Sequence, residues 1–172
     1  MKNIAVYGGS FDPPTLGHID VVKRVYANFD EIHVVVAVNS NKKGFFDASE
    51  RVALLEKALA DLVQKGRVKV KSHQGLLVSY CAKVGAKILI RGLRAVSDFE
   101  AELQMASMNR RLAPKIETFH VMTDEKFLFV SSSLIKEIAE HGVSLSDLVP
   151  AGVEAALKNK FQKLKKTKKT EK

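Results

Sequence analysis

The chain has 172 residues, of which 46% are hydrophobic and 27% are charged, so its length and composition predict one globular domain and exclude a mostly disordered protein. The formal net charge is +9, but residues 158–172, with eight lysines and one glutamate, carry +7 of it, so the charge belongs to one end of the chain. The single cysteine, Cys81, excludes an intramolecular disulfide and a cysteine-built metal site.

Short apolar or β-branched runs alternate with segments of helical periodicity along the chain. The runs predict buried strands at residues 3–7, 31–38, 68–72, 88–90 and 116–121. Apolar spacing and helix-capping residues predict helices at residues 16–29, 47–62, 78–84, 97–112, 131–142 and from 152 into the lysine-rich end. Two of these helices open with a capping-box pattern, at Asp47–Glu50 and at Ser97–Glu100.

Strands and helices therefore alternate five times with short connections. This alternation predicts βαβ crossovers and an α/β fold, a Rossmann-like, doubly wound, five-stranded parallel sheet with helices on both faces. Ligands bind to such sheets at the carboxyl ends of the strands, where the strand order reverses. We therefore expect the chemistry in the segments that follow strands, at residues 8–18, 39–46, 91–98 and 122–133.

The segment GGSFDPPTLGH, residues 8–18, has the composition of a phosphate-binding turn. Its glycines let the backbone approach a ligand, and Ser10 adds a hydroxyl donor. His18 lies in the first turn of the next helix, where free N–H groups and the helix dipole favour an anion. The segment is neither a Walker A loop nor a GxGxxG fingerprint. A tight turn with Thr15 as a helix cap is the alternative, but the combination of residues favours an anion site.

The segment after the fourth strand contains two arginines, Arg91 and Arg94. A guanidinium group presents a planar fork that matches two phosphate oxygens, and the place of these residues at the ligand-binding edge favours polyphosphate binding. In the alternative interpretation they are surface arginines paired with Asp98 or Glu102, and such pairs contribute little.

Two other segments are ambiguous. The loop that carries Lys42 and Lys43, followed by Phe45 and Phe46, can be a mobile loop that closes over an anionic substrate, or a solubilising loop whose phenylalanines enter the core. The three serines that end residues 127–133 lie at a helix start, where capping explains one and phosphate contacts are suggested for the others.

The remaining candidates indicate structure rather than chemistry. The histidines other than His18 do not have the spacing of metal ligands, so no protein metal site is expected. Cys81 lies in an apolar helix and is predicted to be a core residue. Met105 and Met108, at helical spacing, indicate packing or an oligomer interface.

The lysine-rich end is predicted to be a disordered tail over residues 161–172, after a folded domain over residues 1–160. An arm that binds nucleic acid is the less favoured alternative. No apolar run reaches the ~18 residues of a membrane span, and the amino terminus lacks a secretory signal pattern, so we expect a cytoplasmic protein.

These motifs resemble those of a known group of enzymes. Residues 8–18 are similar to the T/H-x-G-H loop of the nucleotidyltransferase superfamily with a Rossmann-like fold. Together with IRGLRAVSDFE (90–100), SSSLIKEI (131–138), the Lys42-Lys43 loop and ERVALL (50–55), they resemble bacterial phosphopantetheine adenylyltransferase. The resemblance covers residues 1 to about 160, so we expect this range to be a nucleotidyltransferase domain.

The resemblance implies transfer of the adenylyl group of ATP to 4′-phosphopantetheine, giving dephospho-coenzyme A and pyrophosphate, the penultimate step of coenzyme A biosynthesis. It also implies Mg²⁺ delivered with ATP, no covalent enzyme intermediate and a homohexamer. Two alternatives remain open: another enzyme of the superfamily that uses nicotinate mononucleotide or CTP, and a basic anion-binding module that uses its tail on nucleic acid.

The resemblance further implies roles for individual residues. His18 would be the catalytic residue and would stabilise the α-phosphate in the transition state. The phosphopantetheine site would be formed by Ser10, Lys42, Leu77 and Arg91. The ATP site would be formed by Ser10, Phe11, His18, Gly92, Leu93, Arg94, Glu102, Phe127, Leu128, Phe129, Val130, Ser131, Ser132 and Ser133.

Overall fold

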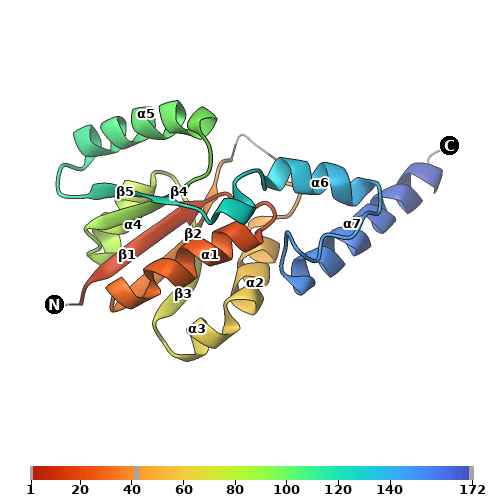
Figure 1. The fold of residues 1–172 in the computed structure, drawn as a ribbon, viewed down its shortest axis with the longest axis horizontal. Coiled ribbons are helices and arrows are strands. Elements are labelled where there is room, and N and C mark those ends of the chain that lie inside the picture. The colour runs from red at the N-terminus through yellow and green to blue at the C-terminus, as the bar shows by residue number, and fades with distance from the viewer. Residues whose placement is uncertain (1, 41–42, 171–172) are drawn as a thin grey trace.

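The computed structural model describes residues 2–40 and 43–170, and it confirms the predicted α/β fold. One parallel sheet has the strand order β3-β2-β1-β4-β5 (Figure 1). The strands are β1 (Ile4–Gly9), β2 (Glu31–Val38), β3 (Val68–Gln74), β4 (Ile88–Leu93) and β5 (Glu117–Met122). Because the chain first builds outward from β1 to β3 and then returns to β4, the strand order reverses between β1 and β4.

The helices cover both faces of this sheet, as expected for a parallel sheet whose central strands are mostly buried. On one face lie α1 (Leu16–Val25), α2 (Ala48–Ala58) and α3 (Ala60–Gln64), and a short 3₁₀ turn, η1 (Tyr26–Asn28), follows α1. On the other face, α4 (Leu77–Val84) buries Cys81, which confirms the prediction that this cysteine is a core residue. Burial raises the pKa of the Cys81 thiol to about 12, so the thiol is not poised as a nucleophile.

The remaining helices lie beyond the central sheet layers. They are α5 (Val96–Leu112), along the β4–β5 edge, η2 (Glu125–Phe127), α6 (Ser132–Glu140) and α7 (Ala151–Thr170) (Figure 1). A separate apolar cluster joins α6 and α7 and includes the buried side chains of Ile135, Val153 and Leu157. This cluster also contains Phe46, so it holds the loop before α2 against the carboxyl-terminal part of the chain.

Two predicted helix features differ from the structure. The helix predicted over residues 47–62 is divided at Leu59, whose φ of −112° and ψ of 19° leave the helical region. Leu59 is fully buried, and Leu55, Leu59 and Leu62 belong to one core cluster, as their i, i+4 and i+7 spacing predicts. The predicted capping box at Ser97–Glu100 is wrong, because α5 begins at Val96 with Ala95 as its extended N-cap residue, which places Ser97 inside the first turn. The capping box at Asp47–Glu50 is confirmed.

The carboxyl-terminal end also departs from the expectation of an irregular tail after residue 160. Helix α7 continues to Thr170, because lysine, glutamine and leucine are good helix formers. Phe161, the first residue of the predicted tail, packs against the ring of Phe45 at a centroid distance of 4.8 Å. The folded part of the chain therefore extends at least to this residue. None of the helices in the described ranges is long and apolar enough to span a membrane.

Candidate active site

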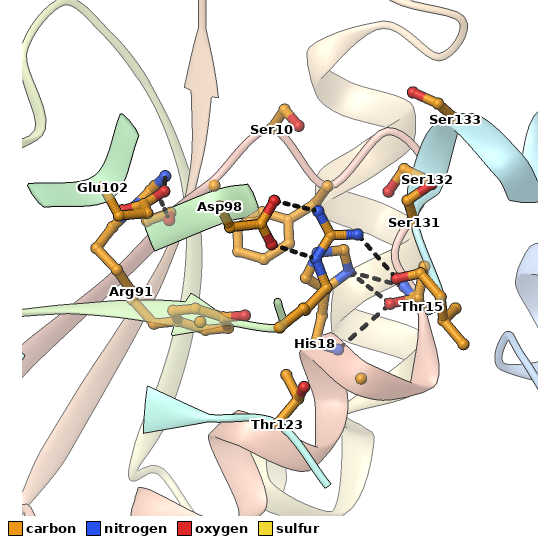
Figure 2. Close-up of a pocket in the computed structure, with 18 of the residues that line it drawn as sticks. Ser10, Thr15, His18, Arg91, Asp98, Glu102, Thr123, Ser131, Ser132 and Ser133 are labelled. Atoms are coloured by element: carbon orange, nitrogen blue, oxygen red, sulfur yellow. Dashed lines mark hydrogen bonds and ion pairs between the residues drawn. The ribbon is translucent and has the colours of Figure 1, made fainter. Parts of the chain in front are cut away.

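A pocket of about 360 Å³ opens at the carboxyl ends of β1 and β4, where the strand order reverses (Figure 2). Its walls come from the loop after β1, the start of α1, the end of β4, the first turns of α5 and the start of α6. This is the position that the fold class predicts for a ligand. The predicted site residues that line the pocket are Ser10, Phe11, His18, Arg91, Gly92, Arg94, Glu102, Val130, Ser131, Ser132 and Ser133.

His18 is held at the amino-terminal end of α1 by reciprocal bonds with Thr15. The backbone N–H of His18 donates to Thr15 Oγ1 (3.4 Å), and the backbone N–H of Thr15 donates to His18 Nδ1 (2.9 Å). A backbone N–H can only donate, so Nδ1 carries a lone pair and the neutral ring has its proton on Nε2. Thr15 is thus a helix cap, as the alternative interpretation proposed, and it also sets the tautomer of His18.

The environment of His18 favours this neutral ring. Burial, followed by the positive charges of Arg94 and Arg91, lowers the pKa of His18 from 6.5 to about 4. Protonation would also place a hydrogen on Nδ1 and break the bond from Thr15. Near neutral pH His18 is therefore an uncharged hydrogen-bond donor with its N–H on Nε2, suited to contact a phosphate oxygen.

Phe11 is buried and packs against the ring of His18. Its side chain is buried, and its ring makes edge-to-face contacts with His18 (centroids 5.0 Å apart) and with Tyr7 (5.3 Å). Phe11 has a positive φ of 48°, an uncommon conformation for a residue with a side chain. The turn after β1 thus places an aromatic ring against His18, while Ser10 is exposed at the pocket rim.

Gly8 and Gly9, the last two residues of β1, lie close to neighbouring side chains. A Cβ on Gly8 would lie 2.3 Å from Cδ1 of Leu77, and a Cβ on Gly9 would lie 3.0 Å from the Phe11 ring. Leu77, predicted in the acceptor site, does not line the pocket; it packs beside it, against Gly8. A larger residue at position 8 would require the Leu77 side chain to move.

Both arginines line the pocket and both pair with a carboxylate of α5. Arg91 donates from Nε and Nη2 to the two oxygens of Glu102, and from Nη1 to the carbonyl oxygen of Gly8. Arg94 pairs in the same forked way with Asp98 and donates to the carbonyl oxygen of Val130. The two interpretations of these arginines are therefore compatible, because the carboxylates orient the guanidinium groups at the pocket wall without removing them from it.

The three serines at the start of α6 have different contacts. Ser131 is the N-cap and its Oγ accepts from the backbone N–H of Leu134 (3.1 Å). Ser132 donates to the carbonyl oxygen of Pro13 (2.8 Å) and so ties this helix start to the turn before α1. All three line the pocket, with Ser133 at its rim (Figure 2). Two helix amino termini, of α1 and α6, thus border the same pocket, which favours an anionic ligand.

Several predicted residues lie elsewhere. Lys42 lies outside the described residues. Leu93 and Phe127 are buried in the protein, Phe129 is 85% exposed, and these residues, like Leu128, do not line the pocket. Phe46 is buried and Phe45 packs on Phe161, so the phenylalanines after the lysine loop belong to the core.

Sequence reasoning did not name three residues that the pocket contains: Tyr7, Ala101 and Thr123. Asp98 was named only as a possible partner of the arginines, and it lines the pocket in that role, paired with Arg94. Thr123 directly follows β5 in a segment that the fold class had marked. Tyr7 is hidden within an apolar strand, where the sequence pattern reports only burial.

The pocket lies at the ligand-binding edge of a Rossmann-like parallel sheet. The chain belongs to the cytidylyltransferase-like family, whose family model matches residues 6–138. The matched range extends from β1 into α6 and therefore includes the pocket walls described above.

Solved structures share this fold. A protein from Vibrio parahaemolyticus assigned as a nicotinate-nucleotide adenylyltransferase is 18% identical, with a TM-score of 0.65, over 92% of this chain and 93% of that one. A lipopolysaccharide core biosynthesis protein from Thermoplasma volcanium GSS1 is 24% identical, with a TM-score of 0.50, over 72% of this chain and 98% of that one.

Proposed function

We propose that this protein is a pantetheine-phosphate adenylyltransferase, which transfers the adenylyl group of ATP to 4′-phosphopantetheine and releases pyrophosphate. The observation that carries the proposal is the neutral His18, with its proton on Nε2, at a helix terminus between two arginines. The choice of acceptor rests on the motifs around Arg91, Ser131 and the lysine loop, which resemble those of this enzyme family.

The proposed reaction needs little proton transfer. The acceptor phosphate monoester is ionised near neutral pH, so its oxygen can attack the α-phosphorus of ATP directly. A new P–O bond forms, the bond between the α-phosphorus and the bridging oxygen breaks, and pyrophosphate leaves with the electron pair. The protein has to align the two phosphates and stabilise charge on the α-phosphate, which are the tasks of positioning and electrostatics in phosphoryl transfer.

Each pocket residue is proposed to contact a particular phosphate group, according to its position. The Nε2–H of His18 would donate to a non-bridging α-phosphate oxygen, and Ser10 at the rim would bind oxygens of the same group. Arg91 and Arg94 keep N–H donors beyond those used on Glu102 and Asp98, so each can contact a phosphate without losing its carboxylate. Lys42 would hold the acceptor phosphate.

Mg²⁺ belongs to the same proposal as an ion carried by the triphosphate. Asp98 and Glu102, the carboxylates of the pocket, each pair with an arginine. The donor set therefore suits an ion coordinated mainly by phosphate oxygens and water, which is common for Mg²⁺. When bound, the ion would neutralise charge on the leaving pyrophosphate.

We also propose that the enzyme is a cytoplasmic homo-oligomer, a hexamer by resemblance. The support in the structure is a set of exposed apolar side chains on α5, Phe99, Leu103, Met105, Met108 and Leu112, each about half exposed (51–54%). Met122 of β5 is exposed to a similar extent. Exposed apolar surface of this kind usually marks a protein interface, and a second copy of this chain is the proposed occupant.

A second acceptor, nicotinate mononucleotide, is favoured by the likeness to the Vibrio parahaemolyticus structure. One experiment separates the candidates: incubation of the full chain with Mg²⁺, ATP or CTP, and each acceptor, with pyrophosphate release as the readout. We expect release with ATP and 4′-phosphopantetheine. Release with nicotinate mononucleotide alone would replace the proposed acceptor, and no release with any combination would favour an anion-binding module.

A further inference from the structure

Thr123 is a buried polar residue of the pocket whose hydroxyl has no partner. It is 9% exposed, and within residues 2–40 and 43–170 its Oγ1 makes no hydrogen bond. A buried hydroxyl without a partner destabilises a fold, so its presence calls for an explanation. Because Thr123 lines the pocket, its position favours a bond to the ligand.

The backbone on both sides of Thr123 is fixed, so its side chain is held in place. Its N–H donates to the carbonyl oxygen of Leu93 (3.0 Å), which continues the pairing of β4 with β5. The next N–H, of Asp124, donates to Oδ2 of Asp20 on α1 (3.2 Å). Figure 2 shows the side chain pointing from the end of β5 into the pocket on the side of His18, opposite Ser10 and Ser133.

The sheet order indicates which part of a nucleotide would reach Thr123. The phosphate-binding groups, Ser10 and His18, follow β1 at the reversal of strand order. The lysine loop and Leu77, proposed for the acceptor, follow β2 and β3 on one side of β1. Thr123 follows β5, the outermost strand on the other side. A nucleoside triphosphate whose phosphates lie at β1 would therefore extend its nucleoside towards β5.

We propose that the Thr123 hydroxyl hydrogen-bonds the nucleoside of the bound nucleoside triphosphate and contributes to nucleotide selection. The proposal rests on the proposed function, because it takes the pocket to be the nucleotide site. A hydroxyl can both donate and accept, so it can meet a base edge or a ribose hydroxyl. A ligand that cannot hydrogen-bond a buried polar group of the site leaves that group unpaired and therefore binds more weakly than a ligand that can.

The test uses Thr123→Val, which removes the hydroxyl at nearly constant shape, and Thr123→Ser, which keeps it. Calorimetric titration with ATP, without any acceptor, should show about five- to tenfold weaker binding for Thr123→Val, the worth of one hydrogen bond. Thr123→Ser should bind within about twofold of the wild type. Tripolyphosphate, which has no nucleoside, should bind equally well to all three proteins.

The Tm of the ligand-free proteins distinguishes a ligand-binding hydroxyl from a structural one. If the Thr123 hydroxyl stabilised the fold, Thr123→Val would lower the Tm. Replacing an unpartnered buried hydroxyl by a methyl group removes a desolvation cost, so Thr123→Val should raise the Tm of the free protein, by about 2–4 °C. A lower Tm would show that the hydroxyl has a structural partner, and would overturn the proposal. Unchanged ATP affinity, or an equal loss of tripolyphosphate binding, would also overturn it.

Comparison of ATP with CTP and 2′-deoxy-ATP identifies the contacted part of the nucleoside. A base contact changes the ratio of ATP to CTP affinity in Thr123→Val, and a ribose contact makes 2′-deoxy-ATP insensitive to the substitution; both results support the proposal. Because no acceptor is present, failure of the adenylyl transfer assay would leave these results unaffected. Wild-type protein that binds tripolyphosphate but no nucleoside triphosphate would overturn both proposals.

Discussion

Among residues 2–40 and 43–170, His18 has a hydrogen-bond partner at Nδ1 and none at Nε2, and this asymmetry decides what the residue can do. Nδ1 accepts from the backbone of Thr15, so the residue has only Nε2–H to offer a substrate. A general base would need a lone pair on the nitrogen that faces the substrate, which this tautomer does not provide. A donor whose orientation is set before substrate binds contributes most where charge develops, at the α-phosphate.

For His18→Ala we expect ATP affinity close to that of the wild type and a kcat lower by on the order of 10²–10³-fold, the usual effect of losing one preorganised donor. The reason is that the bond to His18 strengthens as charge builds on the α-phosphate. ATP dissociation constants and single-turnover rates of both proteins check this. Loss of ATP binding, with a normal rate for bound substrate, would contradict the assignment.

The lowered pKa of His18 predicts how the stability and the single-turnover rate of the protein depend on pH. Between pH 6.5 and about 4 the unfolded chain binds a proton at His18 and the folded protein does not, so the free energy of unfolding falls as the pH drops through this range. Urea unfolding should show this loss to be larger in the wild type than in His18→Ala. The single-turnover rate should show no titration of His18 near pH 6.5, because the pKa of this residue in the folded protein is about 4; a loss of rate near 6.5 that disappears in His18→Ala would contradict the lowered pKa.

At the scale of the elements, sequence periodicity predicted the strands and helices that have a regular apolar pattern. It did not predict a break within a helix or contacts between elements. The run at residues 31–38 predicts β2 with its bounds unchanged, because a strand buried on both faces is apolar throughout. The break at Leu59 has no proline or glycine beside it, so the sequence pattern does not reveal it. Likewise the strand-end rule located the pocket, but the pairing of Arg91 with Glu102 depends on how α5 lies against β4.

The turn after β1 and the loop before α2 are joined by side-chain contacts that the sequence periodicity does not predict. The carboxylate of Asp12, in the turn after β1, accepts from the backbone N–H groups of Phe45 (2.7 Å) and Phe46 (2.8 Å). In the other direction, the buried Arg51 of α2 donates to the carbonyl oxygens of Ser10 (2.8 Å) and Asp47 (3.2 Å). The turn that carries Ser10 is therefore fastened to the start of α2.

Asp12→Asn should lower the free energy of unfolding by about 1–3 kcal/mol, because an amide has one accepting oxygen and would leave a partly buried backbone N–H unpaired. Urea denaturation followed by circular dichroism measures the change. Asp147→Asn, at an exposed position, is the matched control and should change stability by no more than about 0.5 kcal/mol. Equal effects of the two substitutions would show that the Asp12 contacts do not hold the loops together.

At the scale of the whole molecule, charge and apolar surface are separated. The lysine-rich part of α7 extends from one end of the fold, whereas α5, which carries the exposed apolar side chains, lies along the β4–β5 edge (Figure 1). Sequence spacing suggested Met105 and Met108 for packing or an interface; in the described fold both are about half exposed. A helix that packs on its own sheet with one side and leaves large apolar side chains outward is suited to association between copies.

Leu103→Glu places a charge among the exposed apolar side chains of α5, one helical turn from Phe99, and should shift the protein towards the monomer. Burying an unpaired carboxylate between subunits is strongly unfavourable, whereas on a free monomer the same side chain would be solvated. Size-exclusion chromatography with light scattering measures the mass of both proteins, with a hexamer expected for the wild type. The matched control is Leu164→Glu, which changes a similarly exposed leucine on α7, away from α5, and should leave the mass unchanged. A wild-type protein that is monomeric at micromolar concentration would contradict the proposed assembly, and an oligomer unaffected by Leu103→Glu would place its interface elsewhere on the molecule.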